Sequence, residues 1–398
     1  MEPTTMQVKH DFFPFIRVYA DGHVERFKGT DVVPPSIDPL SPVSSKDILI
    51  NPSTCLSLRL YLPNRHPNKL PLLIYFHGGG FCTESAASPT YHNHLTTLSS
   101  DAHIAIASVD YRRAPEHPLP VAYDDSWEAL QWVASQAQAR EREPWLRHHV
   151  DLARVFLGGD SAGGNICHHV AMRVGAEGGL RIEGMVLVHP YFWASAGADA
   201  LTEEERARHE MIWKLICPTL AGFDDPRVNP FGLGAPSLAG LGCARVMVCV
   251  AEKDFMCEWG RRYGEGLKSS GWMGEVEVVE SEGEEHVFHL IDPGCDSSKG
   301  LMKRRFTSQS IHLQNPIPNS PPSPIQTLLN PLPLNPIEET QSGPSDHGLR
   351  PVRAVEVPHR PQGAGFRRRV GRAGGGRGAG DWGRSRDGGG GGGSGGAE

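Results

Sequence analysis

Residues 155–174 have the pattern of a strand, a sharp turn and a helix, and this pattern constrains the fold most. The apolar run 155–157 leads into Gly159-Asp160-Ser161-Ala162-Gly163, and residues 165–174 follow with helical spacing. A turn this tight strains its serine, and glycines two residues before and after it avoid collisions. The pattern predicts an exposed Ser161 hydroxyl at a helix N-terminus, where negative charge is stabilised. Taken alone, the pentapeptide also fits a glycine-rich loop with an incidental serine.

Short apolar runs alternate with helical segments along most of the chain. Buried strands are predicted at 70–76, 104–109, 155–157, 185–188, 246–250 and 276–279. Residues 57–62 alternate in polarity like a half-buried edge strand, and 123–139 have helical spacing. The alternation is typical of a mostly parallel sheet with helices on both faces, so we expect an α/β fold.

Two segments fall outside this alternation and predict a cap over the sheet. Residues 12–16 form an apolar cluster, and 17–27 have a hairpin pattern about an Asp-Gly turn. Residues 201–215 have the pattern of a charged amphipathic helix, followed by a turn-rich stretch. We expect these divisions: a cap segment at 1–45, a main domain at 46–305, and within it a cap insert at about 190–240.

Residues 306–398 differ in composition from the rest of the chain. They are rich in Pro and Ser and then in Arg and Gly, which buries too little apolar surface to fold, so we expect a disordered tail. Residues 301–398 hold 13 Lys and Arg against 7 Asp and Glu, whereas 1–300 hold 26 against 39. We favour unrelated sequence from a gene-model or splicing artefact. RNA contact by the Arg/Gly segment and a proline-rich ligand are the alternatives.

Charge and composition predict the setting of the main domain. Its acidic balance argues against nucleic acid as a partner, and no apolar run reaches the 18 residues typical of a membrane span. The first 15 residues lack the apolar region of a secretory signal. The eight cysteines form neither a Cys-x-x-Cys pair nor a zinc-binding spacing, so we expect free thiols and no metal. These features predict a cytoplasmic protein, with the nucleus as an additional location.

A serine nucleophile needs a base within hydrogen-bonding reach, and the base needs an acid to orient it. After a strand–turn–helix serine the partners come in the order acid, then histidine, each following a strand end. Asp254 stands four residues beyond the 246–250 run, and His286 follows the 276–279 run. We therefore predict Ser161, Asp254 and His286 as catalytic residues.

Each predicted partner of the serine has a rival nearby. Glu252 lies closer to the strand end than Asp254, and any loop carboxylate is most often a solvated charge or a helix cap. His289 lies within the apolar run 287–290 and has the surroundings of a packed or capping histidine.

Acyl transfer also requires N–H groups that meet the negative charge on the carbonyl oxygen. The N–H of Ala162, directly after the serine, is one candidate donor. His77-Gly78-Gly79-Gly80 follows the 70–76 run, and its glycines let successive N–H groups point to one place. We predict Gly79 and Gly80 as donors, with Gly78 needed for the turn. A glycine-rich turn of purely structural use is the alternative.

Several long motifs resemble the hormone-sensitive-lipase-like branch of the α/β-hydrolases. They are His77-Gly78-Gly79-Gly80, Asp110-Tyr111-Arg112-Arg113-Ala114-Pro115-Glu116-His117 and Gly159-Asp160-Ser161-Ala162-Gly163-Gly164-Asn165. Three more are similar to motifs of plant carboxylesterases: Ser44-Ser45-Lys46-Asp47, Phe223-Asp224-Asp225-Pro226-Arg227-Val228-Asn229-Pro230 and Glu285-His286-Val287-Phe288-His289. The resemblance runs from about residue 10 to about residue 305.

The resemblance implies an α/β-hydrolase fold with an eight-stranded sheet, a cap from the N-terminal segment and inserts, and no metal or organic cofactor. It implies that the nucleophile, acid and base are Ser161, Asp254 and His286. It also implies oxyanion donors among Gly78, Gly79, Gly80 and Ala162. The implied activity is that of a serine carboxylesterase acting on small apolar or aromatic esters through an acyl-enzyme.

The same branch contains 2-hydroxyisoflavanone dehydratases and gibberellin receptors, which supply two alternatives. The receptors lack the catalytic histidine, so His286 favours turnover over binding alone. At least some dehydratases carry Thr at the nucleophile position, so Ser161 favours an esterase. Five aromatic residues of the cap either line the substrate site or form the cap core: Phe12, Phe13, Phe15, Trp193 and Trp213. The natural ester and the oligomeric state stay open.

Overall fold

The computed structural model describes residues 7–139, 142–194 and 201–306. The predicted tail falls outside the described residues from 307 onward, and so do residues 195–200 of the predicted cap insert. The division of the chain into cap, main domain and tail stays a prediction.

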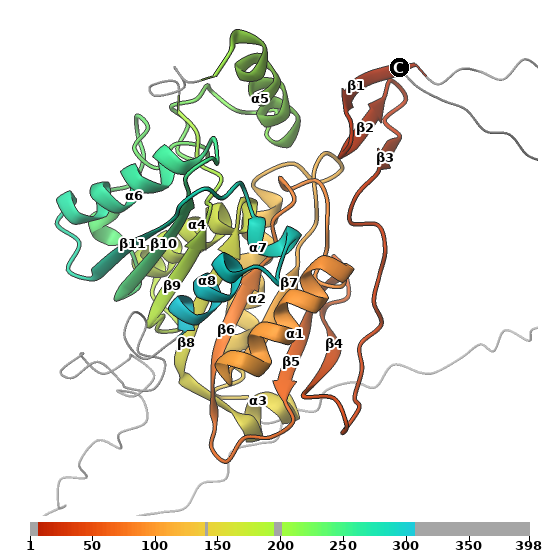
Figure 1. Cartoon of the computed structure of the whole chain (residues 1–398), viewed down its shortest axis with the longest axis vertical. Helices are drawn as coiled ribbons and strands as arrows, with labels where there is room; N and C mark the ends of the chain where they lie inside the picture. The colour runs from red at the N-terminus through yellow and green to blue at the C-terminus, as the bar shows by residue number, and fades with distance from the viewer. Residues whose placement is uncertain (1–6, 140–141, 195–200, 307–398) are drawn as a thin grey trace, which may run out of the picture. The chain divides into compact units, whose positions relative to one another are not determined.

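An eight-stranded sheet runs through the described part of the chain (Figure 1). Its strand order is β11-β10-β9-β8-β6-β7-β5-β4. Neighbours are parallel from β11 to β7, and β5 is antiparallel to both β7 and β4, which confirms the mostly parallel sheet. The strands are β4 (Val43–Asn51), β5 (Leu56–Pro63), β6 (Leu70–Phe76), β7 (Ala105–Asp110), β8 (Val150–Asp160), β9 (Gly184–Val188), β10 (Arg245–Ala251) and β11 (Glu275–Ser281).

Helices cover both faces of this sheet, which explains the continuous apolar runs of its central strands. Successive side chains of β6 point to opposite faces of the sheet. Ile74 packs in the core on one face, with a first group of helices, and Leu73 packs in the core on the other face, with a second group. The first group consists of α2 (Val121–Ser135), α4 (Ala162–Glu177) and α6 (Cys257–Ser269). The second consists of α1 (Pro89–Ala102), α7 (Phe288–Ile291) and α8 (Asp296–Phe306). Other helical elements in the described ranges are α3 (Pro144–His149), α5 (Glu203–Ile216) and the short 3₁₀ turn Leu238–Gly240.

The prediction of residues 57–62 as an edge strand is wrong. β4 pairs on the outer side of β5, so β5 lies inside the sheet. The alternation that indicated an exposed face includes Arg59, which is 1% exposed. Its guanidinium donates to both carboxylate oxygens of Asp47 on β4, at 2.6 and 2.8 Å. A buried, paired arginine thus gives an interior strand the sequence pattern of an edge.

The predicted N-terminal hairpin is present as β2 (Ile16–Tyr19) and β3 (Val24–Arg26), and β1 (Val8–Phe12) adds a third strand. Arg26 ties this small sheet to the main domain. Its guanidinium donates to the carbonyl of Cys82 at 2.7 Å and to the carboxylate of Glu116 at 2.6 and 2.8 Å.

The helix α5 matches the amphipathic segment predicted at 201–215. Thr202 and Glu205 form a reciprocal capping box at its start, and Trp213 and Ile216 are buried at its end. None of the helices in the described ranges has both the length and the apolar character needed to cross a bilayer.

Candidate active site

Ser161 occupies the predicted sharp turn between β8 and α4. Its backbone has φ 51° and ψ −117°, a strained conformation for a residue with a side chain. A Cβ on Gly163 would lie 1.9 Å from the carbonyl oxygen of Phe76, and one on Gly159 would lie 2.5 Å from the carbonyl of Gly163. Only glycine fits at these two positions, as the sequence pattern predicted.

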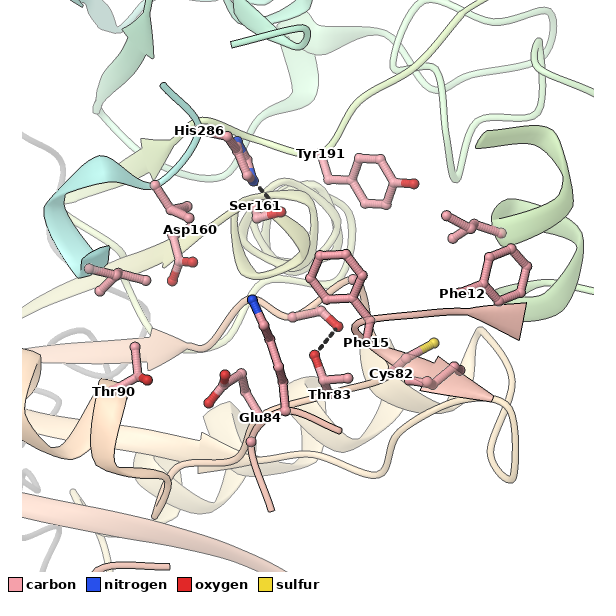
Figure 2. A pocket seen from close by; sticks show the side chains of 18 of the residues that line it. Phe12, Phe15, Cys82, Thr83, Glu84, Thr90, Asp160, Ser161, Tyr191 and His286 are labelled. Atoms are coloured by element: carbon pink, nitrogen blue, oxygen red, sulfur yellow. Dashed lines mark hydrogen bonds between the residues drawn. The ribbon is translucent and has the colours of Figure 1, made fainter. Parts of the chain in front are cut away.

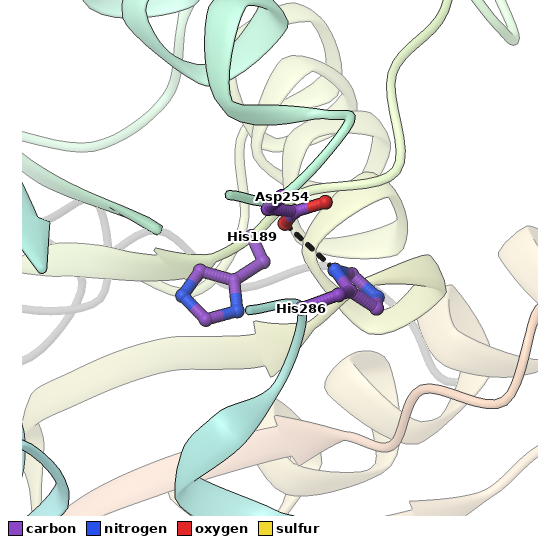
Figure 3. Close-up of side chains that lie close together, drawn as sticks. All are labelled: His189, Asp254 and His286. Carbon is purple, nitrogen blue, oxygen red and sulfur yellow. Dashed lines mark hydrogen bonds and ion pairs between the residues drawn. The ribbon is translucent and has the colours of Figure 1, made fainter. Parts of the chain in front are cut away.

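The structure brings Ser161, His286 and Asp254 into one chain of hydrogen bonds. Nε2 of His286 lies 3.1 Å from Oγ of Ser161 (Figure 2), and Nδ1 of His286 lies 2.7 Å from Oδ2 of Asp254 (Figure 3). Asp254 is buried, and its Oδ1 accepts the N–H of Met256 at 2.9 Å. Because a carboxylate only accepts, the Nδ1 proton of His286 points to Asp254 and leaves Nε2 to accept from the serine hydroxyl.

The two rival side chains point elsewhere. The carboxylate of Glu252 accepts the N–H of Gly283 at 2.6 Å, which ties it to the loop after β11. His289 is buried, with its ring 5.2 Å from that of His94 and 5.8 Å from that of His189. The chain of contacts to Ser161 therefore runs through Asp254 and His286.

The carbonyls of the glycine loop (residues 77–80) accept hydrogen bonds from protein groups, which fixes the direction of the N–H groups that follow them. In a trans peptide the C=O and the next N–H point in opposite directions. The carbonyl of Gly78 accepts from Nδ1 of His77 at 2.8 Å and from the Tyr111 hydroxyl at 3.3 Å, so the N–H of Gly79 points away from both. The carbonyl of Gly79 accepts the N–H of Thr83 at 2.9 Å, so the N–H of Gly80 points away from Thr83.

The N–H of Ala162 is oriented by the same principle. The carbonyl of Ser161 accepts the N–H of Tyr191 at 2.9 Å and that of Asn165 at 3.2 Å. The N–H of Ala162 therefore points away from these groups. Ala162 is the first residue of α4, and an N–H in the first turn of a helix has no acceptor within the helix. Gly79, Gly80 and Ser161 all line one cavity.

Gly78 differs from its two neighbours in the glycine loop. Its N–H donates to the hydroxyl of Tyr91 at 2.7 Å, inside the protein. This donor is already engaged, so the structure contradicts Gly78 as an oxyanion donor and leaves it the role of shaping the turn.

The cavity beside Ser161 has a volume of about 750 Å³ and is lined by residues of both predicted cap segments. Phe12 and Phe15 reach it from the N-terminal segment, and Ile212 and Leu215 reach it from α5. The other predicted cap aromatics lie elsewhere: Trp193 and Trp213 are buried in the hydrophobic core, and Phe13 is 62% exposed.

The cavity also has charged lining residues that the sequence did not single out. They are Lys28, Glu84 and Arg208. In Figure 2, Glu84 and Thr90 lie on one side of Ser161, and the aromatic rings of the cap lie on the other. No local pattern marks these residues, because their place in the wall depends on how distant segments fold over the sheet.

His189, Asp254 and His286 place potential metal-ligand atoms within 4.8 Å of one another (Figure 3). These atoms are engaged by protein partners. Nδ1 of His189 accepts the N–H of Val287 at 2.8 Å, and the other two side chains bond to each other at 2.7 Å. The donor set therefore fits a positioned base better than it fits a metal.

Burial lowers the pKa of His77 to about 3 and that of His169 to about 4. In the unfolded chain each imidazole takes up a proton as the pH falls below about 6.5, whereas in the folded protein it stays neutral down to its lowered pKa. Proton binding therefore favours the unfolded chain in this range, and stability is lost as the pH falls from about 6.5 towards the folded pKa. We expect the free energy of unfolding to drop by about 2 kcal/mol per histidine between pH 7.5 and 5. Urea unfolding across this range measures the drop, and a flat or rising stability would contradict it.

Comparisons with known proteins show the family to which the chain belongs. A family model described as alpha/beta hydrolase fold (Abhydrolase_3) matches residues 73–290. Tuliposide A-converting enzyme b3, amyloplastic, from Tulipa gesneriana is 47% identical over 307 residues, which cover 76% of this chain and 80% of the relative. Probable carboxylesterase 4, mitochondrial, from Arabidopsis thaliana is 47% identical over 305 residues, covering 73% and 80%. A thermophilic carboxylesterase cloned from a metagenomic library has a similar structure, with TM-score 0.57, 26% identity and coverage of 68% and 90%.

The predicted cytoplasmic or nuclear location is contradicted by these relatives. One is named for the amyloplast and another for the mitochondrion. The prediction depended on the lack of an apolar leader. An apolar leader is a feature of secretory signals. Organelle-targeting segments are amphipathic and are not detected in that way.

Proposed function

We propose, from the premise that this chain belongs to the alpha/beta hydrolase family, that it is a serine carboxylesterase with Ser161 as its nucleophile. One observation carries the proposal: the hydrogen-bonded chain from Ser161 through His286 to Asp254 opens on a cavity of about 750 Å³. Two of the similar proteins carry a carboxylesterase name: the plant protein probable carboxylesterase 4 and the carboxylesterase cloned from a metagenomic library.

The acylation step follows from this geometry. Oγ of Ser161 attacks the ester carbonyl carbon while Nε2 of His286 takes the hydroxyl proton. The buried carboxylate of Asp254 stabilises the imidazolium that results. Negative charge collects on the former carbonyl oxygen, where the N–H groups of Gly79, Gly80 and Ala162 stabilise it. His286 then gives its proton to the departing alcohol oxygen, and the acyl group remains on Ser161.

Deacylation repeats these steps with water. Nε2 of His286 removes a proton from a water molecule, and the hydroxide attacks the acyl carbon. The oxyanion again faces the same N–H groups. When the intermediate breaks down, His286 returns the proton to Oγ of Ser161 and the carboxylic acid leaves, so the enzyme is regenerated.

The substrate class follows from the walls of the cavity. Phe12, Phe15 and Ile212 offer apolar surface on the cap side, which suits a small apolar or aromatic group of the ester. No separate observation favours the dehydratase or the ligand receptor over the esterase. A receptor that only binds its ligand would also have no use for a base 3.1 Å from the serine hydroxyl.

Hydrolysis of p-nitrophenyl acetate and butyrate by the purified full chain tests the proposal. We expect release of p-nitrophenolate, with saturation at increasing ester concentration. Folded protein that leaves both esters intact would contradict an esterase and favour elimination chemistry or ligand binding.

Asp254→Asn should lower kcat for p-nitrophenyl butyrate by about 10⁴-fold, with a small effect on KM. The amide fills the same space, but its NH₂ group can face His286 and favour the tautomer that has its proton on Nε2. Steady-state kinetics measures the loss, and Glu252→Gln is the matched control because that carboxylate contacts Gly283 instead. A larger loss in the Glu252 variant would reverse the assignment of the acid.

A further inference from the structure

Asp160, the residue before Ser161, is a carboxylate that is 1% exposed. Two tyrosine hydroxyls donate to it at the same distance. Tyr75 donates to Oδ1 at 2.8 Å, and Tyr91 donates to Oδ2 at 2.8 Å. Both rings are buried, and they come from different elements: Tyr75 from β6 and Tyr91 from α1.

The two tyrosines differ in their contact with the glycine loop. The Tyr91 oxygen also accepts the N–H of Gly78, at 2.7 Å. Because the carboxylate of Asp160 cannot donate, the phenolic proton of Tyr91 goes to Asp160 and its lone pair takes the N–H. Burial raises the pKa of Tyr91 well above its usual value, so the proton stays on the hydroxyl.

This hydroxyl joins the glycine loop directly to the serine turn. A Cβ on Gly78 would lie 2.4 Å from Oδ2 of Asp160 and 2.8 Å from the Tyr91 oxygen, so the loop backbone sits against both groups. Tyr111 holds the same loop from its carbonyl side, with its hydroxyl donating to the carbonyl of His77 at 2.7 Å. Tyr91 holds the loop from the N–H of Gly78.

We propose that Tyr91 is a positioning residue that holds the glycine loop against the serine turn, so that Gly79 and Gly80 direct their N–H groups to the same point as Ala162. The proposal rests on the proposed function, since it concerns the oxyanion of that reaction. Stabilisation of this kind requires donors within hydrogen-bonding distance of the oxyanion, and small displacements are costly. Loss of the Tyr91 hydroxyl frees the loop and leaves the three reacting side chains in place.

Tyr91→Phe and Tyr75→Phe form a matched pair for the test. Each removes one hydroxyl from the same buried carboxylate, and only the first releases Gly78. We would measure kcat and KM for p-nitrophenyl butyrate per active site, counting sites by complete inactivation with diethyl p-nitrophenyl phosphate. We would also measure inhibition by a trifluoromethyl ketone. Oγ of Ser161 adds to the carbonyl of this inhibitor and places an oxyanion at the same point, while the hydroxyl proton passes to His286.

We expect Tyr91→Phe to lower kcat per site by about tenfold or more, to leave KM unchanged and to weaken ketone inhibition by a similar factor. Tyr75→Phe should keep kcat per site near that of the unmodified chain. Equal kcat per site in the two variants would overturn the proposal and reduce Tyr91 to a structural role.

Two further outcomes are distinguishable. If Tyr91→Phe does not fold, Asp160→Asn is the second variant, because it weakens the hydrogen bond that orients the Tyr91 hydroxyl. It should also lower kcat per site relative to Tyr75→Phe, and an unchanged value would overturn the proposal. If the unmodified chain turns over no ester, the proposed function itself fails and this inference fails with it.

Discussion

Ser161→Ala is expected to lower kcat for p-nitrophenyl butyrate by about a million-fold and to leave the fold intact. Without Oγ no acyl-enzyme forms, and water must attack the bound ester with help from the oxyanion donors alone. The site should accommodate alanine, because the substitution removes only the hydroxyl oxygen and adds no atom that could collide. The backbone of residue 161 lies at φ 51°, and the variant keeps Gly159 and Gly163, where an added Cβ would collide with backbone atoms.

Steady-state kinetics, circular dichroism and the melting temperature together measure this result. Ser126→Ala is the matched control, since Ser126 is also buried but donates to the carbonyl of Ala122 within α2, at 2.7 Å. It should keep the kcat of the unmodified chain. Substantial turnover by the Ser161 variant at unchanged stability would mean that another group is the nucleophile.

His286→Ala should cause a loss of similar size, about a million-fold in kcat. Its Nε2 lies 3.1 Å from Oγ of Ser161, and without this base the hydroxyl stays protonated and poorly nucleophilic. Because the two residues act in one step, their effects should not add. The Ser161→Ala/His286→Ala double variant should be no slower than either single variant.

The double variant also provides the check on this interpretation. Multiplicative losses would mean that Ser161 and His286 contribute independently, contrary to a serine activated by the histidine. The rates are compared at equal concentrations of folded protein, because His286 is packed beside His189 with ring centroids 5.7 Å apart.

Local sequence patterns predicted the parts of the site that lie on or beside strand ends. Ser161 has its own turn signature, and Asp254 and His286 each follow an apolar run, so chain order and the parallel sheet bring them to one edge. The place of Gly79 and Gly80 could be predicted for the same reason. These features depend on residues close together in the sequence.

Features that depend on distant pairings could not be predicted. The position of β5 depends on β4 and on the buried pair of Arg59 with Asp47. Gly78 contacts a hydroxyl that belongs to α1, which no pattern in the loop indicates. The charged residues Lys28 and Arg208 of the cavity wall meet there because they belong to two segments far apart in sequence that line the same cavity.

Identification of the residue that carries the covalent intermediate tests the central claim most directly. Diethyl p-nitrophenyl phosphate transfers its diethylphosphoryl group to an activated serine and releases p-nitrophenol. After inactivation, intact-mass and peptide mass spectrometry should find one diethylphosphoryl group per chain, on Ser161, and none in the Ser161→Ala variant. Loss of esterase activity with the group on another residue, or with Ser161 unmodified, would contradict the account.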